Sequence, residues 1–148
     1  MVDTGTPTNA LRYASVAVTS AEFKGAYAAP KLLIAAPGAN QMIVVDQMQM
    51  VMTYGAANYA NGGVVFAQYD STANGAGVKA TNTEAAADFF AAASTTFAFN
   101  GTSGNTVGAL PFSTTVNKGL YLSNATGAFD TGDSAFVVKI YYRIIATA

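Results

Sequence analysis

Residues 116–145 read V-N-K-G-L-Y-L-S-N-A-T-G-A-F-D-T-G-D-S-A-F-V-V-K-I-Y-Y-R-I-I, and this stretch decides the fold class. Near its end, large apolar side chains occupy every second position from Phe136 to Ile144. The positions between them hold Val137, Lys139, Tyr141 and Arg143. A period of two is typical of a β-strand with one face in a core. The stretch therefore predicts a long final strand, preceded by a shorter strand at residues 116–123 and a turn-rich link.

Further strand-like segments occur along the rest of the chain. Strands are predicted at residues 14–19, 31–35, 41–54, 64–69 and 95–99. Turn signals separate them, because Pro37 and Gly38 favour chain reversal and residues 70–80 and 100–108 have the composition of loops. Short strands with turns between them predict one all-β domain, an antiparallel sandwich or barrel.

At most one or two short helices are expected in this domain. Ser20 is a candidate N-cap for a helical turn that contains Glu22, a residue that is favourable near a helix N-terminus. Residues 81–84, T-N-T-E, fit a capping box before an alanine-rich segment.

The strand predicted at residues 41–54 changes phase in its middle. Ile43 and Val45 share one face by simple alternation, whereas Met48, Met50 and Met52 fall on the other. The change at Asp46 indicates either a β-bulge or a switch of the strand between sheets. The methionine stripe fits a sandwich core, a subunit interface or a ligand pocket, because methionine adapts to all three.

Length and charge limit the possible partners. The 148 residues suit one domain, which we divide into a polar arm, residues 1–13, and a sandwich, residues 14–148. Only 10% of residues are charged, which leaves little repulsion against association and favours an assembly. The seven cations are scattered, so a nucleic-acid partner is not expected. The sequence has no apolar run long enough to predict a membrane span, and residues 1–5 do not resemble a secretion signal.

The chain lacks the residues that most hydrolases and metal sites use. It contains no Cys and no His, which excludes thiolate and imidazole chemistry. Asp-Thr-Gly occurs at residues 3–5 and 130–132, a triplet that aspartic proteases use in pairs, but its surroundings favour an arm and a turn. Asp130 and Asp133 are the best local pair for calcium, with a plain turn as the alternative. We expect no enzyme activity and no cofactor.

Four segments together resemble a known family. They are P-K-L-L-I-A-A-P-G-A at residues 30–39, Q-M-I-V-V at 41–45, N-K-G-L-Y-L at 117–122 and the closing strand, 132–144. In patches across residues 14–145, the chain resembles the jelly-roll capsid decoration (cement) proteins of tailed bacteriophages. The resemblance implies a jelly-roll-like antiparallel sandwich with an extended N-terminal arm.

The resemblance also implies a function and partners. It implies a homotrimer that binds the outside of the phage head, contacts the major capsid protein and stabilises the shell, after synthesis in the host cytoplasm. A head-fibre or tail-tip module that recognises a host surface glycan is the alternative. Candidate subunit or capsid interface residues are Arg12, Tyr13, Met48, Met50, Met52, Tyr54, Tyr141 and Arg143.

Overall fold

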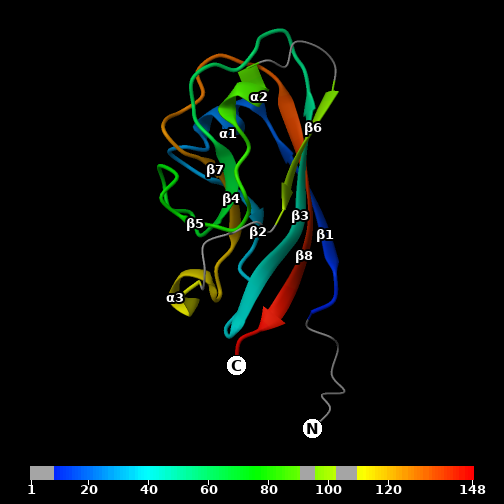
Figure 1. The fold of residues 1–148 in the computed structure, drawn as a ribbon, viewed down its shortest axis with the longest axis vertical. Helices are drawn as coiled ribbons and strands as arrows, with labels where there is room; N and C mark the ends of the chain where they lie inside the picture. The colour runs from blue at the N-terminus through cyan, green and yellow to red at the C-terminus, as the bar shows by residue number, and fades with distance from the viewer. Residues whose placement is uncertain (1–8, 91–95, 103–109) are drawn as a thin grey trace.

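The computed structural model describes residues 9–90, 96–102 and 110–148, and two antiparallel sheets pack face to face within them (Figure 1). The predicted all-β sandwich is confirmed. The strands are β1 (Arg12–Val18), β2 (Lys31–Ile34), β3 (Gln41–Thr53), β4 (Val65–Tyr69), β5 (Val78–Lys79), β6 (Thr96–Thr102), β7 (Leu120–Asn124) and β8 (Ala135–Ala146). The helices are α1 (Ser20–Gly25), α2 (Ala86–Phe90) and α3 (Phe112–Thr115), one more than expected.

The strand order is that of a jelly roll. One sheet has the order β1-β8-β3-β6 and the other has the order β2-β7-β4-β5. Each strand of the first half of the chain therefore pairs with a strand of the second half: β1 with β8, β2 with β7, β3 with β6 and β4 with β5. This is a long hairpin of paired strands wrapped into two layers, which gives the two Greek keys of the jelly roll.

A β-bulge in β3 resolves the phase change at Asp46. Val45 pairs with Tyr142 and Gln47 pairs with Tyr141, so Asp46 is an extra residue in β3. The β-bulge, one of the two alternatives predicted at Asp46, is therefore confirmed. It returns the methionines to the same side of the sheet as Ile43 and Val45, so simple alternation did not give their face. All five of these side chains are at most 1% exposed, so the methionine stripe belongs to the core.

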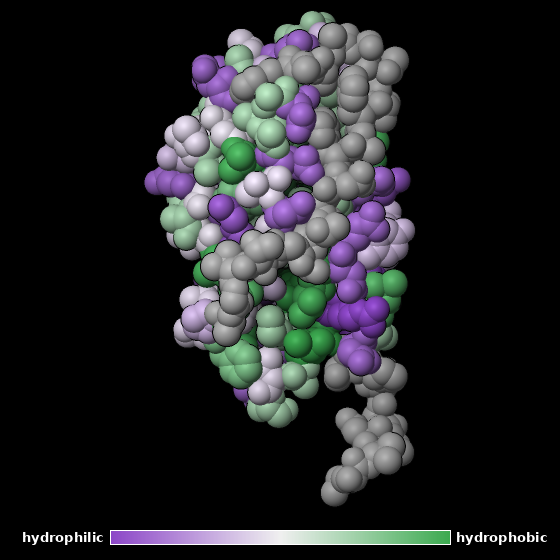
Figure 2. Space-filling model, viewed as in Figure 1, coloured by the Kyte–Doolittle hydropathy of each residue, from purple (hydrophilic) through white to green (hydrophobic). Residues whose placement is uncertain are grey.

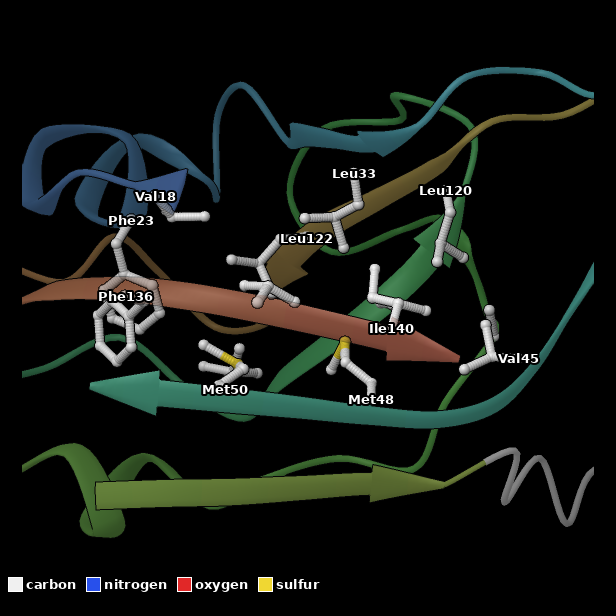
Figure 3. Close-up of a cluster of buried hydrophobic side chains, with 14 of the residues drawn as sticks. Val18, Phe23, Leu33, Val45, Met48, Met50, Leu120, Leu122, Phe136 and Ile140 are labelled. Carbon is white, nitrogen blue, oxygen red and sulfur yellow. The ribbon is translucent and has the colours of Figure 1, made fainter. Parts of the chain in front are cut away.

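Side chains from both sheets meet between the layers. Figure 3 shows Met48, Met50 and Ile140 on one side and Leu33, Leu120 and Leu122 on the other. The alternation predicted for the closing strand is confirmed from Phe136 to Ile140, where every second side chain is buried. It does not continue to Ile144, because residues 142–145 are all partly buried. A hydrogen bond also joins the layers, because the Tyr69 hydroxyl in β4 donates to the Ile43 carbonyl in β3 at 2.6 Å. Burial raises the pKa of Tyr69 to about 12, so the hydroxyl keeps its proton.

Phe23 of α1 closes one end of this core. Its ring lies 4.4–5.3 Å, centroid to centroid, from the rings of Tyr59, Phe89, Phe129 and Phe136. These rings come from a helix, a strand and two connections, so one side chain joins segments that are distant in the sequence. Phe23 is 1% exposed.

The N-terminus of α1 carries a capping box. Thr19, not the predicted Ser20, is the N-cap, and its hydroxyl accepts a hydrogen bond from the Glu22 N–H at 3.2 Å. The Glu22 carboxylate accepts in return from the Thr19 N–H at 2.9 Å. It also accepts from the Lys31 ammonium at 2.5 Å. The bond from Lys31 is the first cause, and the backbone of Thr19 the second, that lowers the pKa of Glu22 to about 2.

This lowered pKa predicts one component of the stability at acid pH. An unfolded glutamate titrates near pH 4.3. The ionised carboxylate of Glu22 therefore stabilises the fold above about pH 5, and this stabilisation is lost as the pH falls towards 2. We expect the destabilisation caused by Glu22→Gln, measured by urea unfolding, to be larger at pH 6 than at pH 3. Glu84→Gln is the control of opposite sign, because burial raises the pKa of Glu84. A Glu22→Gln effect that does not change with pH would contradict this prediction.

Four predicted boundaries differ from the structure. β7 begins at Leu120, four residues after the start predicted at Val116. The predicted capping box at residues 81–84 does not begin a helix, because Glu84 pairs with Val65 at the edge of β4 and the Thr81 hydroxyl accepts from the Ala67 N–H at 3.0 Å. The segment predicted as a loop, residues 70–80, contains β5. β6 continues to Thr102, into the predicted loop 100–108, whose remainder lies outside the described residues.

The predicted N-terminal arm is shorter than expected at its end towards the sandwich. β1 begins at Arg12, two residues before the expected start, and residues 1–8 of the predicted arm lie outside the described residues. No helix in the described parts of the chain has the length and hydropathy that crossing a membrane requires. Figure 2 shows hydrophobic residues at the surface in its lower half, where Figure 1 places the start of β3 and the end of β8.

Candidate interaction face

The β1-β8-β3-β6 sheet has one side against the core and one side away from it, which we call the outer face. In Figure 1, the three helices lie away from this side. Strand register aligns its side chains in rows across β1, β8 and β3. The outer face comprises Tyr13, Tyr141 and Gln47 in one row, Ser15, Lys139 and Gln49 in the next, and Ala17, Val137 and Val51 in the third.

The outer face is nearly uncharged and partly apolar. Lys139 is the one charged residue among its nine members. Tyr13 is 51% exposed and Tyr141 is 40% exposed, and their ring centroids lie 5.1 Å apart. Val137, in the third row, is 37% exposed. Exposed aromatic and aliphatic side chains beside amides and hydroxyls are typical of surfaces that become buried in a complex.

An ion pair fixes one corner of this face. The Arg143 Nε donates to the Asp46 carboxylate at 2.9 Å, and its Nη1 donates to the Asn9 carbonyl at 3.0 Å. Asp46 is the extra residue of the β3 bulge, so the bulge turns its carboxylate towards Arg143 in β8. Both side chains remain about 40% exposed, and such a pair contributes little stability. Its consequence is a fixed orientation for Arg143 next to Tyr141.

The structure brings together some of the predicted interface residues and excludes others. Tyr13 and Tyr141 are in contact on the outer face, and Arg143 lies at its corner. Arg12 is exposed at the start of β1 and pairs with Tyr142 in the sheet. Tyr54 is partly buried against the core. The assignment of Met48, Met50 and Met52 to an interface was wrong, because neighbouring strands and the opposite sheet already bury them.

Several members of the outer face were missed from the sequence. Val137 and Lys139 were placed opposite the core face of the closing strand, but Gln47, Gln49 and Val51 were not connected with them. Ser15 and Ala17 carry no compositional signal of their own. Strand register defines the group, and a single sequence does not display register.

The segment Asp130 to Asp133 holds a loop in place. The Asp133 carboxylate accepts hydrogen bonds from the Ala56 and Ala57 N–H groups at 2.9–3.0 Å, and these bonds lower its pKa. The Thr131 hydroxyl donates to the Asn58 carbonyl at 2.8 Å, and Asp130 accepts from the side chain of Asn61. The described residues contain no group of three or more acidic side chains that could hold a metal ion. The turn interpretation of this segment therefore fits its contacts.

Two hollows in the surface bear on the glycan-binding alternative. One, of about 420 Å³, lies between α1 and β2 and is lined by Ala21, Glu22, Gly25, Ala29, Pro30, Lys31 and Leu32. The other, of about 200 Å³, contains Asp70, whose carboxylate accepts from Lys118 at 2.6 Å, and the buried Tyr69. Neither hollow presents an exposed aromatic ring, on which sugars commonly stack.

Comparisons with protein-family models, with curated proteins and with solved structures give no match to this chain.

Proposed function

We propose that this chain is a virion structural protein, a capsid decoration (cement) protein that binds the outside of a phage head as a homotrimer. The observation that carries the proposal is the outer face, a nearly uncharged sheet surface that displays Tyr13 and Tyr141. Jelly rolls are common in viral capsids, and the resemblance noted in the sequence points to the same class. The role needs no catalytic group.

The mechanism is addition of interface area. Each subunit of the trimer lays its outer face against major capsid proteins that meet at a junction of the shell. A specific interface buries roughly 1,600 Å², and aromatic side chains at its centre contribute most of the affinity. Three such contacts held by one trimer act together, so the trimer holds neighbouring shell subunits against expansion.

Binding to purified heads tests this function. We expect wild-type protein to bind undecorated heads of the phage that encodes it and to raise the temperature at which they release DNA. Tyr141→Asp and Val137→Asp place a carboxylate on the outer face and should weaken binding at least about tenfold. Leu32→Asp, at a side chain that is 45% exposed on β2 of the other sheet, is the matched control.

Three measurements can contradict the proposed function: the thermal tolerance of heads, binding to host glycans, and the mass of the protein in solution. Heads with equal thermal tolerance with and without the protein would exclude the stabilising role. Binding to host surface glycans, instead of to heads, would favour the fibre or tail-tip alternative. Light scattering on the purified protein tests the trimer, for which the expected mass is three times that of the chain.

A further inference from the structure

The edges of the two sheets differ in how well they are protected against pairing with another chain. Unpaired edge strands attract other strands, and proteins usually shorten them, bend them or place lysine or proline there. β2 has four residues, follows Pro30, includes Lys31 and shifts register between Leu32 and Ile34. β5, the opposite edge of that sheet, has two residues, one of which is Lys79. Both edges of the second sheet are therefore protected.

β1 has none of these protections. It is an edge of the first sheet, and its seven residues pair with β8 in unbroken register from Arg12 with Tyr142 to Val18 with Phe136. Its sequence, R-Y-A-S-V-A-V, contains no proline or lysine. In the described residues, no backbone hydrogen bond joins residues 12–18 to a segment other than β8. Half of the backbone N–H and C=O groups of β1 therefore point away from the sheet, and no backbone group of the described residues bonds to them.

The side chains beside this edge favour a partner of a particular kind. Leu11 is 55% exposed and Tyr13 is 51% exposed, and both would be covered by a strand laid along β1. Arg12 is exposed, and no carboxylate of the described residues forms an ion pair with it or with Lys139. Asp46, the acid nearest this corner of the sheet, is paired with Arg143. Within the part of the chain that the structure describes, the edge is thus apolar and carries positive charge without an ion-pair partner.

We propose that the edge of β1 binds an extended segment of another protein, which adds a fifth strand to the β1-β8-β3-β6 sheet. The segment has apolar side chains at alternate positions, which cover Leu11 and Tyr13, and a carboxylate that pairs with Arg12. Strand addition of this type obtains affinity from main-chain hydrogen bonds and specificity from alternate side chains. The inference rests on the proposed function, in which the segment belongs to the shell protein.

A second copy of this chain fits the same edge less well. Antiparallel pairing of β1 with itself requires a twofold axis, which a trimer lacks. The sequence of β1 also contains no acidic residue, so a second copy brings no carboxylate to Arg12.

Peptides with blocked amides test strand addition directly. The probe is an octapeptide with capped termini that alternates valine with threonine and carries one glutamate. It is used in three forms: unmodified, N-methylated at its odd-numbered amides, and N-methylated at its even-numbered amides. A peptide added to a sheet edge directs only every second amide at that edge. We expect one methylated form to bind the full chain at least about tenfold more weakly and the other to bind within about twofold of the unmodified peptide. Hydrogen exchange of β1 amides should slow when the unmodified peptide binds.

The charge component has its own control. Arg12→Ala should weaken the glutamate peptide about twofold to fivefold and leave a glutamine version unchanged, as expected for one partly exposed ion pair. Lys24→Ala, which removes one positive charge from α1, should leave both peptides unchanged. Equal losses for the two methylated forms, or no binding at about 1 mM peptide, would overturn the proposal. So would β1 protection that rises with protein concentration alone, which indicates self-pairing.

The peptide experiment and the head-binding experiment test the two proposals independently, so a failure of one is distinguishable from a failure of the other. Peptide binding with alternating sensitivity, but without binding to heads, would leave the β1 site in place and remove the capsid function. Binding to heads without peptide binding would leave the function in place and remove the β1 site.

Discussion

Replacement of Phe23 by alanine is expected to destabilise the protein by about 3–5 kcal/mol, the largest effect of any single side chain considered for this chain. Phe23 is 1% exposed and is within 5.3 Å of four aromatic rings, centroid to centroid. Deletion of its ring removes apolar contacts and leaves a cavity, because rings from a strand and two connections cannot all collapse into the space. Each aromatic pair adds about 0.5–1.5 kcal/mol beyond its buried area.

Urea unfolding monitored by circular dichroism measures this effect. If Phe23→Ala does not fold, Phe23→Leu keeps most of the volume and should cost about 1.5 kcal/mol. Phe112→Ala is the matched control, since Phe112 begins α3 and is 60% exposed; a change within about 0.5 kcal/mol is expected there. Similar losses at Phe23 and Phe112 would show that the ring cluster does not hold this end of the sandwich.

Replacement of Gly132 by alanine is expected to cost about 3 kcal/mol. Gly132 has φ +98°, which an L-residue adopts with strain. A Cβ at this position would also lie 2.3 Å from the ring of Tyr59. That ring cannot move away easily, because its hydroxyl donates to the Ser134 carbonyl and it packs against Phe23.

The control for Gly132 is another glycine of the same β7–β8 connection. A Cβ at Gly127 meets no atom within 4 Å, so Gly127→Ala should change the free energy of unfolding by less than about 0.5 kcal/mol. Thermal melting of the two variants side by side gives the comparison. Equal melting temperatures would contradict the role assigned to the Asp130 to Asp133 segment in the packing of Tyr59.

The core strands could be predicted because their pattern is local. In β8, burial alternates from Phe136 to Ile140 as the sequence alone suggests, and Leu120 and Leu122 in β7 are buried in the same way. A side chain that points inward at every second residue leaves a direct trace in the sequence. Together with the other short strands and the turn signals between them, these two strands predicted an antiparallel sandwich.

The position of the methionine stripe could not be predicted by alternation alone. One inserted residue, Asp46, reverses the direction of every later side chain in β3, so the same sequence allows two opposite assignments. The start of α2 failed for a related reason. Thr81 to Glu84 has the residues of a capping box, but hydrogen bonds to β4 use Thr81 and Glu84 and delay the helix to Ala86. In both cases, contacts with a distant strand outweigh a local preference.

The candidate face was only partly predictable for the same reason. Tyr13 and Tyr141 could each be selected as exposed aromatic residues, but their contact depends on the pairing of β1 with β8. Gln47 and Gln49 join the face only after the bulge sets the register of β3. An interaction face on a sheet is a property of several strands, and its members are separated by most of the chain.

The position of β8 has a consequence for how the protein is made. β8 lies between β1 and β3, yet it is the last of the eight strands along the chain. During synthesis, the first sheet therefore lacks the strand that joins β1 to β3, and β1 has no partner in the sheet until residue 135 and beyond have been added. Contacts between opposite ends of a chain form slowly. Closure of the sandwich is thus a late event, and the nascent chain needs protection from aggregation up to that moment.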